Sequence, residues 1–153
     1  ENGSLQAAAR LAGHYMFSDG EGAQKAVKWF QFGAERGHIW CQSMLAFYYY
    51  YGGFLPTGSE NEKDMAEAAK WYRRAAMQGD GSAQISIGEM YAQGSGIRQD
   101  YVEAYKWFNV AAASNERVNY GVFAPESSDA AKKLIRPIAE RANVARDKIA
   151  QQM

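Results

Sequence analysis

The chain has 153 residues, enough for one domain, and its hydrophobic share of 47% allows a buried core. Lys and Arg together number 17, as do Asp and Glu, so the formal net charge is zero and we expect no nucleic acid partner. No apolar run approaches the roughly 20 residues that a membrane-spanning helix needs, and the single cysteine, Cys41, excludes an internal disulfide.

The beginning of the chain predicts two helices joined by a short turn. Leu11 and Tyr15 are four residues apart, which is the spacing of one face of an amphipathic helix. A Gly-rich polar turn follows at residues 18–22. The next helix carries Ala26 and Trp29 on one face, so the first unit is expected to be a helical hairpin.

The same pattern recurs twice further along the chain. The equivalent positions are Leu45, Tyr49, Ala68 and Trp71 in the second unit, and Ile87, Tyr91, Ala104 and Trp107 in the third. Trp29 lies 20 residues before Tyr49, and Trp71 lies 20 residues before Tyr91, so the connection between successive hairpins is constant. The turn inside each hairpin varies in length, and the second turn, residues 52–63, is the longest. We expect the repeated Tyr and Trp residues to fill the space beside each helix crossing.

Polar residues mark several helix starts. Asp64 and Asp100 each precede a glutamate by three residues, Glu67 and Glu103, which is the pattern of a helix N-cap. Ser82 is the expected N-cap of the first helix in the third unit.

The pattern fades after the third unit. Residues 115–127 are polar and predict a loop, and residues 128–151 predict a helical cap. Pro137 is expected to kink this cap or to start a second helix within it. Lys and Arg on its polar side are interspersed with Asp and Glu, which favours a solvated face over a basic membrane-binding or nucleic-acid-binding helix.

These motifs together resemble the Sel1-like repeats of bacterial proteins, which are related to the tetratricopeptide repeats. The third unit carries the pattern most completely, through Ile87, Gly88, Tyr91, Gly94, Gly96, Asp100, Ala104, Trp107, Ala111 and Ala112. The resemblance implies an all-α fold, a solenoid of about three αα-hairpins that winds as a right-handed superhelix. The chain is then one domain, 1–153, with repeats at about 4–37, 38–79 and 80–114, the loop at 115–127 and a C-terminal capping helix at 128–151.

Side chains that could support catalysis or bind a metal are few. Neither His14 nor His38 has a cysteine or carboxylate at metal-ligand spacing. The acidic residues near the long turn lack the regular spacing of a calcium-binding loop. We therefore expect that the protein is not an enzyme and binds no cofactor or metal. Cys41 is expected to be a small core residue.

The first helix of the second unit is expected to have two apolar faces. Leu45 and Tyr49 occupy the packing stripe of the repeat. A second group of large side chains falls within about 60° on roughly the opposite side: Trp40, Met44, Phe47 and Tyr51. In tetratricopeptide repeats that side of the helix lines the concave groove. By resemblance, the groove positions are Gln6, Ala9, Gly13 and Met16, then Trp40, Ser43, Phe47, Tyr50 and Tyr51, then Ser82, Ile85, Glu89 and Gln93.

An aromatic groove is typical of protein binding, because Trp and Tyr supply large contact areas at low cost in conformational entropy. The resemblance therefore implies a monomeric interaction module or adaptor that binds a peptide or protein surface and regulates or neutralises its partner. The central groove residues are Trp40, Ser43, Phe47, Tyr50, Tyr51, Ile85 and Glu89.

Three alternatives remain open at this point. The rings can instead pack against Phe54, Leu55 and Pro56 of the long turn or against the C-terminal helix. A hydrolase of cell-envelope polymers would need two carboxylates facing each other in a cleft. A structural scaffold segment would have a polar groove. The compartment is also open, cytoplasmic or exported to the periplasm, because the chain begins with Glu1 and a targeting segment can precede it.

Overall fold

The fold is known from a computed structural model of the whole chain. It describes residues 2–16, 21–52, 64–113, 133–141 and 144. In these ranges the long helices are α1 (Asn2–Tyr15), α2 (Glu21–Glu35), α3 (Ile39–Tyr51), α4 (Met65–Met77), α5 (Gly81–Gln93) and α6 (Tyr101–Ala113). Residues 133–141 are helical as well, and no strand occurs in the described part of the chain. The protein is all-α, as the repeat pattern predicts.

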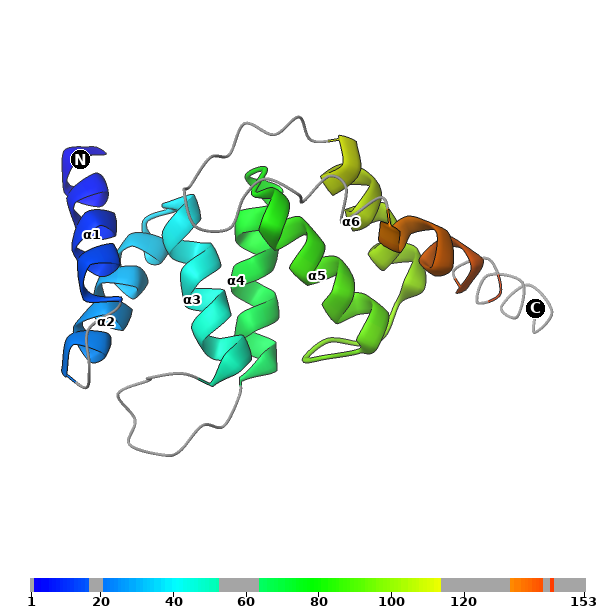
Figure 1. Cartoon of the computed structure of the whole chain (residues 1–153), viewed down its shortest axis with the longest axis horizontal. Coiled ribbons are helices and arrows are strands. Elements are labelled where there is room, and N and C mark those ends of the chain that lie inside the picture. The colour runs from blue at the N-terminus through cyan, green and yellow to red at the C-terminus, as the bar shows by residue number, and fades with distance from the viewer. Residues whose placement is uncertain (1, 17–20, 53–63, 114–132, 142–143, 145–153) are drawn as a thin grey trace.

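The helices form a solenoid in which each packs mainly against its neighbours in sequence. Helices α1 and α2, α3 and α4, and α5 and α6 form three hairpins, and α2 with α3 and α4 with α5 join successive hairpins. Figure 1 shows the hairpins following one another along the long axis, with α1 at one end and residues 133–141 at the other. Hydrophobic burial is therefore shared between neighbouring units, which a single hairpin does not achieve alone.

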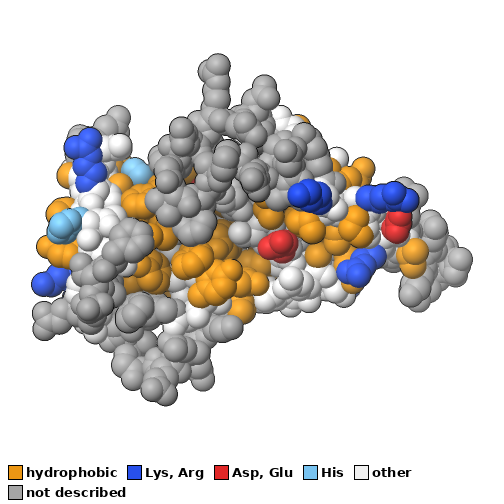
Figure 2. Space-filling model, viewed as in Figure 1, with side chains coloured by type: hydrophobic (Ala, Val, Ile, Leu, Met, Phe, Trp, Pro, Cys, Tyr) orange, Lys and Arg blue, Asp and Glu red, His pale blue; other side chains and the backbone are white. Residues whose placement is uncertain are grey.

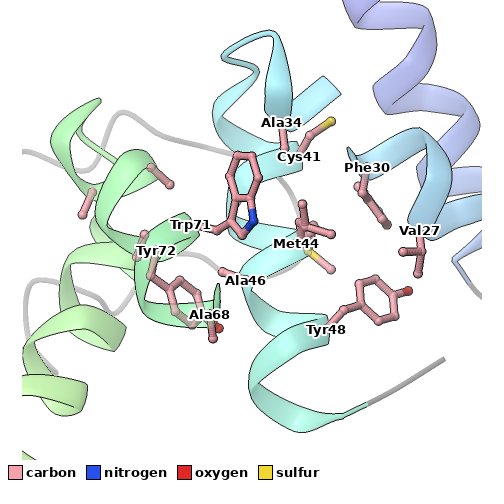
Figure 3. Close-up of a cluster of buried hydrophobic side chains, with 14 of the residues drawn as sticks. Val27, Phe30, Ala34, Cys41, Met44, Ala46, Tyr48, Ala68, Trp71 and Tyr72 are labelled. Carbon is pink, nitrogen blue, oxygen red and sulfur yellow. The ribbon is translucent and has the colours of Figure 1, made fainter. Parts of the chain in front are cut away.

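The core runs through the hairpin junctions. Figure 3 shows side chains of three helices meeting there, with Phe30 from α2, Met44 and Tyr48 from α3, and Trp71 and Tyr72 from α4. Phe30 has no exposed surface, and its ring centroid lies 5.7 Å from that of Tyr48. One continuous cluster of buried side chains thus ties the first hairpin to the second and third.

Small residues lie where helices approach closely, as the repeat pattern predicts. Ala26, Ala68 and Ala104, one from each hairpin, have no exposed surface. Gly88 of α5 is tighter still, because a Cβ atom added there would lie 2.7 Å from Cε1 of Phe108 on α6. No larger residue fits this crossing without displacing the Phe108 ring.

A hydrogen bond that the sequence analysis did not anticipate recurs at both hairpin junctions. The side-chain amide of Gln42 donates to the backbone carbonyl of Ala34 over 3.1 Å, and that of Gln84 donates to the carbonyl of Ala76 over 3.1 Å. Both glutamines are buried and lie 42 residues apart. The carbonyls of Ala34 and Ala76 also accept from the backbone N–H groups of Gly37 and Gly79. Each glutamine therefore adds a second hydrogen bond to a carbonyl in the last turn of the preceding helix, from the next hairpin.

The starts of α4 and α6 agree with the sequence analysis. Asp64 Oδ1 accepts a hydrogen bond from the backbone N–H of Glu67 over 3.0 Å. Asp100 Oδ1 accepts from the backbone N–H of Glu103 over 3.0 Å. Both aspartates are therefore N-caps, as predicted.

The prediction that Ser82 caps α5 is wrong. The helix begins at Gly81, so Ser82 already lies in its first turn. The N-cap is Asp80, whose Oδ1 accepts from the backbone N–H of Ala83 over 3.0 Å. Asp80 holds the extended backbone that an N-cap needs, directly after the junction turn.

His38 occupies the equivalent position before α3. Its Nδ1 accepts a hydrogen bond from the backbone N–H of Cys41 over 3.4 Å, so this nitrogen carries no proton in the folded protein. Burial lowers the pKa of the imidazole below its ordinary value of 6.5. His38 is thus a structural residue whose protonation removes the cap of α3.

We expect the stability of the protein to depend on His38 in mildly acidic solution. Since folding lowers its pKa, the unfolded chain binds the proton more readily, and this contribution is complete above about pH 6.5. It is lost as pH falls from there through the folded pKa, by up to about 1 kcal/mol, the usual value of an N-cap. Urea unfolding between pH 7 and pH 5.5 measures the effect. His38→Asp, which copies Asp80, should reduce the slope, and an unchanged slope in this variant would rule out His38 as its source.

Residues 133–141 pack against the third hairpin. Ile138 is 6% exposed and forms a small cluster with Ala104 and Phe108 of α6. Pro137 lies inside this helical stretch, so the expectation that it starts a second helix is wrong. Residues 115–127, and the predicted cap outside 133–141 and 144, lie beyond the part of the chain that the structure describes.

Candidate functional site

The structure gives the predicted groove residues different surroundings, and Trp40 is half-buried between two helices. Its ring centroid lies 5.2 Å from that of Phe30 on α2, edge to face. Its Cη2 atom would lie 3.2 Å from a Cβ added to Gly13 on α1. Trp40 therefore packs inside the protein and joins the first two hairpins.

Ser43 also makes an internal contact. Its hydroxyl donates to Asp80 Oδ2 over 2.5 Å, while Oδ1 of the same carboxylate caps α5. Asp80 is only 6% exposed. Ser43 thus connects α3 to the start of α5, and its hydroxyl is engaged within the solenoid.

Ile85 is engaged at the other end of the face. It packs against the cluster of Phe108 and Ile138, together with Leu134 and Ile135. Ile85 and the helical stretch 133–141 therefore belong to the same cluster. The alternative in which the C-terminal helix packs against the rings of α3 concerns other residues, because this cluster contains none of those rings. The other form of that alternative, packing against Phe54, Leu55 and Pro56, falls on residues outside the described ranges.

The remaining rings of α3 form a cluster at the C-terminal end of the helix, here called the α3 ring cluster: Phe47, Tyr50 and Tyr51. The centroids of Phe47 and Tyr51 lie 4.5 Å apart, and those of Tyr50 and Tyr51 lie 4.9 Å apart. Tyr51 is 58% exposed, and the other two rings are half-buried. Hydrophobic side chains gather on the surface over the middle helices in the view of Figure 2.

A buried tyrosine of α4 packs against the α3 ring cluster. Tyr72 is 6% exposed, and its ring centroid lies 6.4 Å from that of Tyr50. Burial raises the pKa of Tyr72, and a side-chain hydrogen bond with Ser86 on α5 acts in the opposite direction. Tyr72 thus contacts Tyr50 of α3 and Ser86 of α5 at the same time.

Glu89 of α5 lies beside the same cluster. It follows Phe47 by 42 residues and so holds the equivalent position in the next repeat. Ser86, three residues before Glu89 on α5, hydrogen-bonds to Tyr72, whose ring centroid lies 6.4 Å from that of Tyr50. Burial raises the pKa of Tyr50, and Tyr51 and the Glu89 carboxylate raise it further. Glu89 is half-buried, and burial raises its own pKa. In the described part of the chain it forms no ion pair and no hydrogen bond.

The repeated Tyr and Trp residues pack against the core. Trp71 is 6% exposed, while Tyr15, Trp29, Tyr49, Tyr91 and Trp107 are half-buried and contact the buried cluster. Their equivalent roles explain why they repeat in the sequence. The indole N–H of Trp71 is buried without a hydrogen-bond partner among the described residues.

The described residues offer little support for metal binding or catalysis. No group of three or more His, Cys, Asp and Glu side chains that could hold a metal occurs among them. Burial raises the pKa of the Cys41 thiol to about 12, so it is not a ready nucleophile. Along α1, α3 and α5, Glu89 is the only carboxylate, whereas a glycosidase needs two that face each other. None of the described helices is both long and apolar enough to cross a membrane.

Comparisons with known proteins agree with this architecture. Three stretches match the Sel1 repeat, residues 5–38, 41–80 and 81–116. The structure is similar to a Sel1 repeat protein from Oxalobacter formigenes, with a TM-score of 0.67 and 28% identity over 89% of this chain and 90% of that chain. It is also similar to c5321, a protective antigen of uropathogenic Escherichia coli strains with an SLR fold, with a TM-score of 0.64 and 32% identity. That match covers 92% of this chain and 28% of c5321.

One curated protein shows a shorter match. The chitin synthase regulator SKT5 of Saccharomyces cerevisiae is 38% identical over 56 residues. The match spans 37% of this chain and 8% of the yeast protein. Sel1 repeats are generally protein–protein interaction modules and typically have no enzymatic activity.

Proposed function

The chain belongs to the Sel1 repeat family, and we propose that it binds a short segment of a partner protein on the face formed by the α3 ring cluster and Glu89. The observation that carries this proposal is the exposure of Tyr51, which is 58% exposed while its ring contacts those of Phe47 and Tyr50. An exposed ring flanked by two half-buried rings costs solvation free energy in the unbound protein and is typical of an interaction surface.

The surroundings of the α3 ring cluster favour binding further. Tyr50 rests on the buried ring of Tyr72, and Phe47 packs against the main core cluster. Because these rings are already restricted, a partner would lose little conformational entropy from this side on binding. A segment used only as a structural spacer would not need such rings on its surface.

The consequence of binding is proposed to be regulation of the partner. SKT5 is a regulator of chitin synthase, and its similarity to this chain is confined to a short segment. Regulation by binding needs no catalytic group on this chain, which fits the face described above. Neutralising a partner protein requires the same contact and is one form of such regulation. We further propose that the chain acts as a monomer.

Selection from a random 12-residue peptide display library on the full chain tests the proposal. We expect enriched peptides to bind wild-type protein and to lose at least about tenfold in affinity on Phe47→Ala/Tyr51→Ala, as hot-spot rings do. Tyr105→Ala is the matched control, since Tyr105 is a 37% exposed ring on α6 away from the cluster. Failure to enrich any peptide, or equal losses in both variants, would contradict the proposal. Circular dichroism confirms that each variant remains helical.

A further inference from the structure

Charged residues are nearly absent from α3 and α5, the first helices of the second and third hairpins. The sequence of α3, Ile39–Tyr51, contains no Asp, Glu, Lys or Arg, and Glu89 is the only charged residue of α5, Gly81–Gln93. A single carboxylate is thus placed beside an uncharged aromatic surface. No side chain of α3 or α5 can neutralise it.

The carboxylate of Glu89 is not stabilised by internal contacts in the described part of the chain. It is half-buried, and no ion pair or hydrogen bond to it is formed among those residues. Surface carboxylates elsewhere differ, since Glu67 pairs with Lys70 and Glu103 pairs with Lys106. Partial burial of an unpaired carboxylate costs free energy that a bound cation would recover.

The position of Glu89 relative to the rings defines what can bind there. It occupies the repeat position of Phe47 on α5, and it lies one helical turn after Ser86, which hydrogen-bonds to Tyr72 next to the Tyr50 ring. Its charge also contributes to the raised pKa of Tyr50. The ring centroid of Tyr50 in turn lies 4.9 Å from that of the exposed Tyr51. A cation placed here would meet a carboxylate and aromatic rings together, which is the combination that recognises basic side chains.

We propose that Glu89, together with Tyr50 and Tyr51, receives an arginine or lysine side chain of the bound segment, while a neighbouring apolar side chain of that segment rests on Phe47 and Tyr51. Arginine is the better fit, because its planar guanidinium can stack on a tyrosine ring while it pairs with a carboxylate. This inference rests on the proposed function and adds the chemical class of the partner: a segment with a basic residue beside a large apolar one.

The same random peptide library, now read by composition, tests the inference. We expect peptides selected on wild-type protein to be enriched in arginine or lysine next to a large apolar residue. Glu89→Gln should weaken their binding about tenfold, as the loss of a charge-assisted contact does, and should reduce the dependence of binding on salt. Glu35→Gln is the matched control, because it removes the same charge from an exposed position on α2.

Two further measurements keep the outcome unambiguous. Glu89→Gln removes a partly buried charge, so it should melt at the same or a higher temperature than wild type. Glu89→Lys should bind peptides in which the basic residue is replaced by glutamate better than it binds the originals. Peptides without basic enrichment, or unchanged binding by Glu89→Gln, would overturn the inference. If Phe47→Ala/Tyr51→Ala still loses binding in that case, the proposed function is retained and only the inference about a basic residue is rejected. If neither set of variants changes binding, both are rejected.

Discussion

Replacing Phe30 by alanine is expected to lower the free energy of unfolding by about 3–5 kcal/mol, the usual loss for a buried phenylalanine. Phe30 has no exposed surface, and its ring contacts Trp40 and Tyr48 of the next hairpin. Its removal therefore leaves a cavity at the junction between the first two hairpins. Urea denaturation followed by circular dichroism measures the loss.

Phe32 provides the control for this prediction. It lies on the same helix but is only half-buried, with the Arg36 guanidinium carbon 3.7 Å from its ring centroid. Phe32→Ala should cost under about 1 kcal/mol, because it loses a surface cation–π contact and creates no cavity. Similar losses at the two positions would contradict the placement of Phe30 at a buried junction.

Replacing Asp80 by alanine is expected to cost about 2–3 kcal/mol. One carboxylate oxygen caps α5 through the N–H of Ala83, and the other accepts the Ser43 hydroxyl from α3. The variant loses an N-cap, worth about 1 kcal/mol, and a buried hydrogen bond to a charged group. Thermal and urea unfolding both report the change.

Asp64 is the matched control for Asp80. It caps α4 in the same way, through the N–H of Glu67, but it is exposed and forms no hydrogen bond with another hairpin among the described residues. Asp64→Ala should therefore cost about 1 kcal/mol, the value of the cap alone. Ser43→Ala should lower the free energy of unfolding by about the difference between the Asp80→Ala and Asp64→Ala losses. An Asp80→Ala loss no larger than that of Asp64→Ala would show that the bond between hairpins adds nothing.

The repeat made most of the fold predictable from sequence. Tyr and Trp recur at fixed spacing across each junction, and the small residues mark helix crossings. The close contact of Gly88 with the Phe108 ring gives the physical reason for one of those small residues. Local capping rules also located the starts of α4 and α6, because Asp64 and Asp100 act within their own helices.

Contacts between hairpins were harder to predict. Both Asp80 and Ser82 are suitable caps by local rules. What stabilises Asp80 further is Ser43, 37 residues earlier in the chain. The buried hydrogen bonds of Gln42 and Gln84 to the preceding helices have no local signal either. Comparing the repeats position by position, 42 residues apart, would have revealed the paired glutamines.

The candidate site was only partly predictable for the same reason. Helical periodicity places Trp40, Ser43 and Phe47 on one side of α3, but it does not say which neighbouring helix each one meets. Trp40 contacts Phe30 of α2, and Ser43 contacts Asp80, so both are used internally. Phe47 remains with Tyr51 at the end of α3, and its binding role is still a prediction.

The most direct test of the proposed function is an NMR titration of the isotope-labelled 153-residue chain with one of the selected peptides. We predict that the largest chemical-shift changes will occur at the C-terminal half of α3, around Phe47 and Tyr51, and at Glu89 on α5. We also predict that these changes will disappear in Phe47→Ala/Tyr51→Ala. Changes concentrated on α2, α4 or α6, with Phe47 and Tyr51 unaffected, would contradict the proposal that the α3 ring cluster is the binding surface.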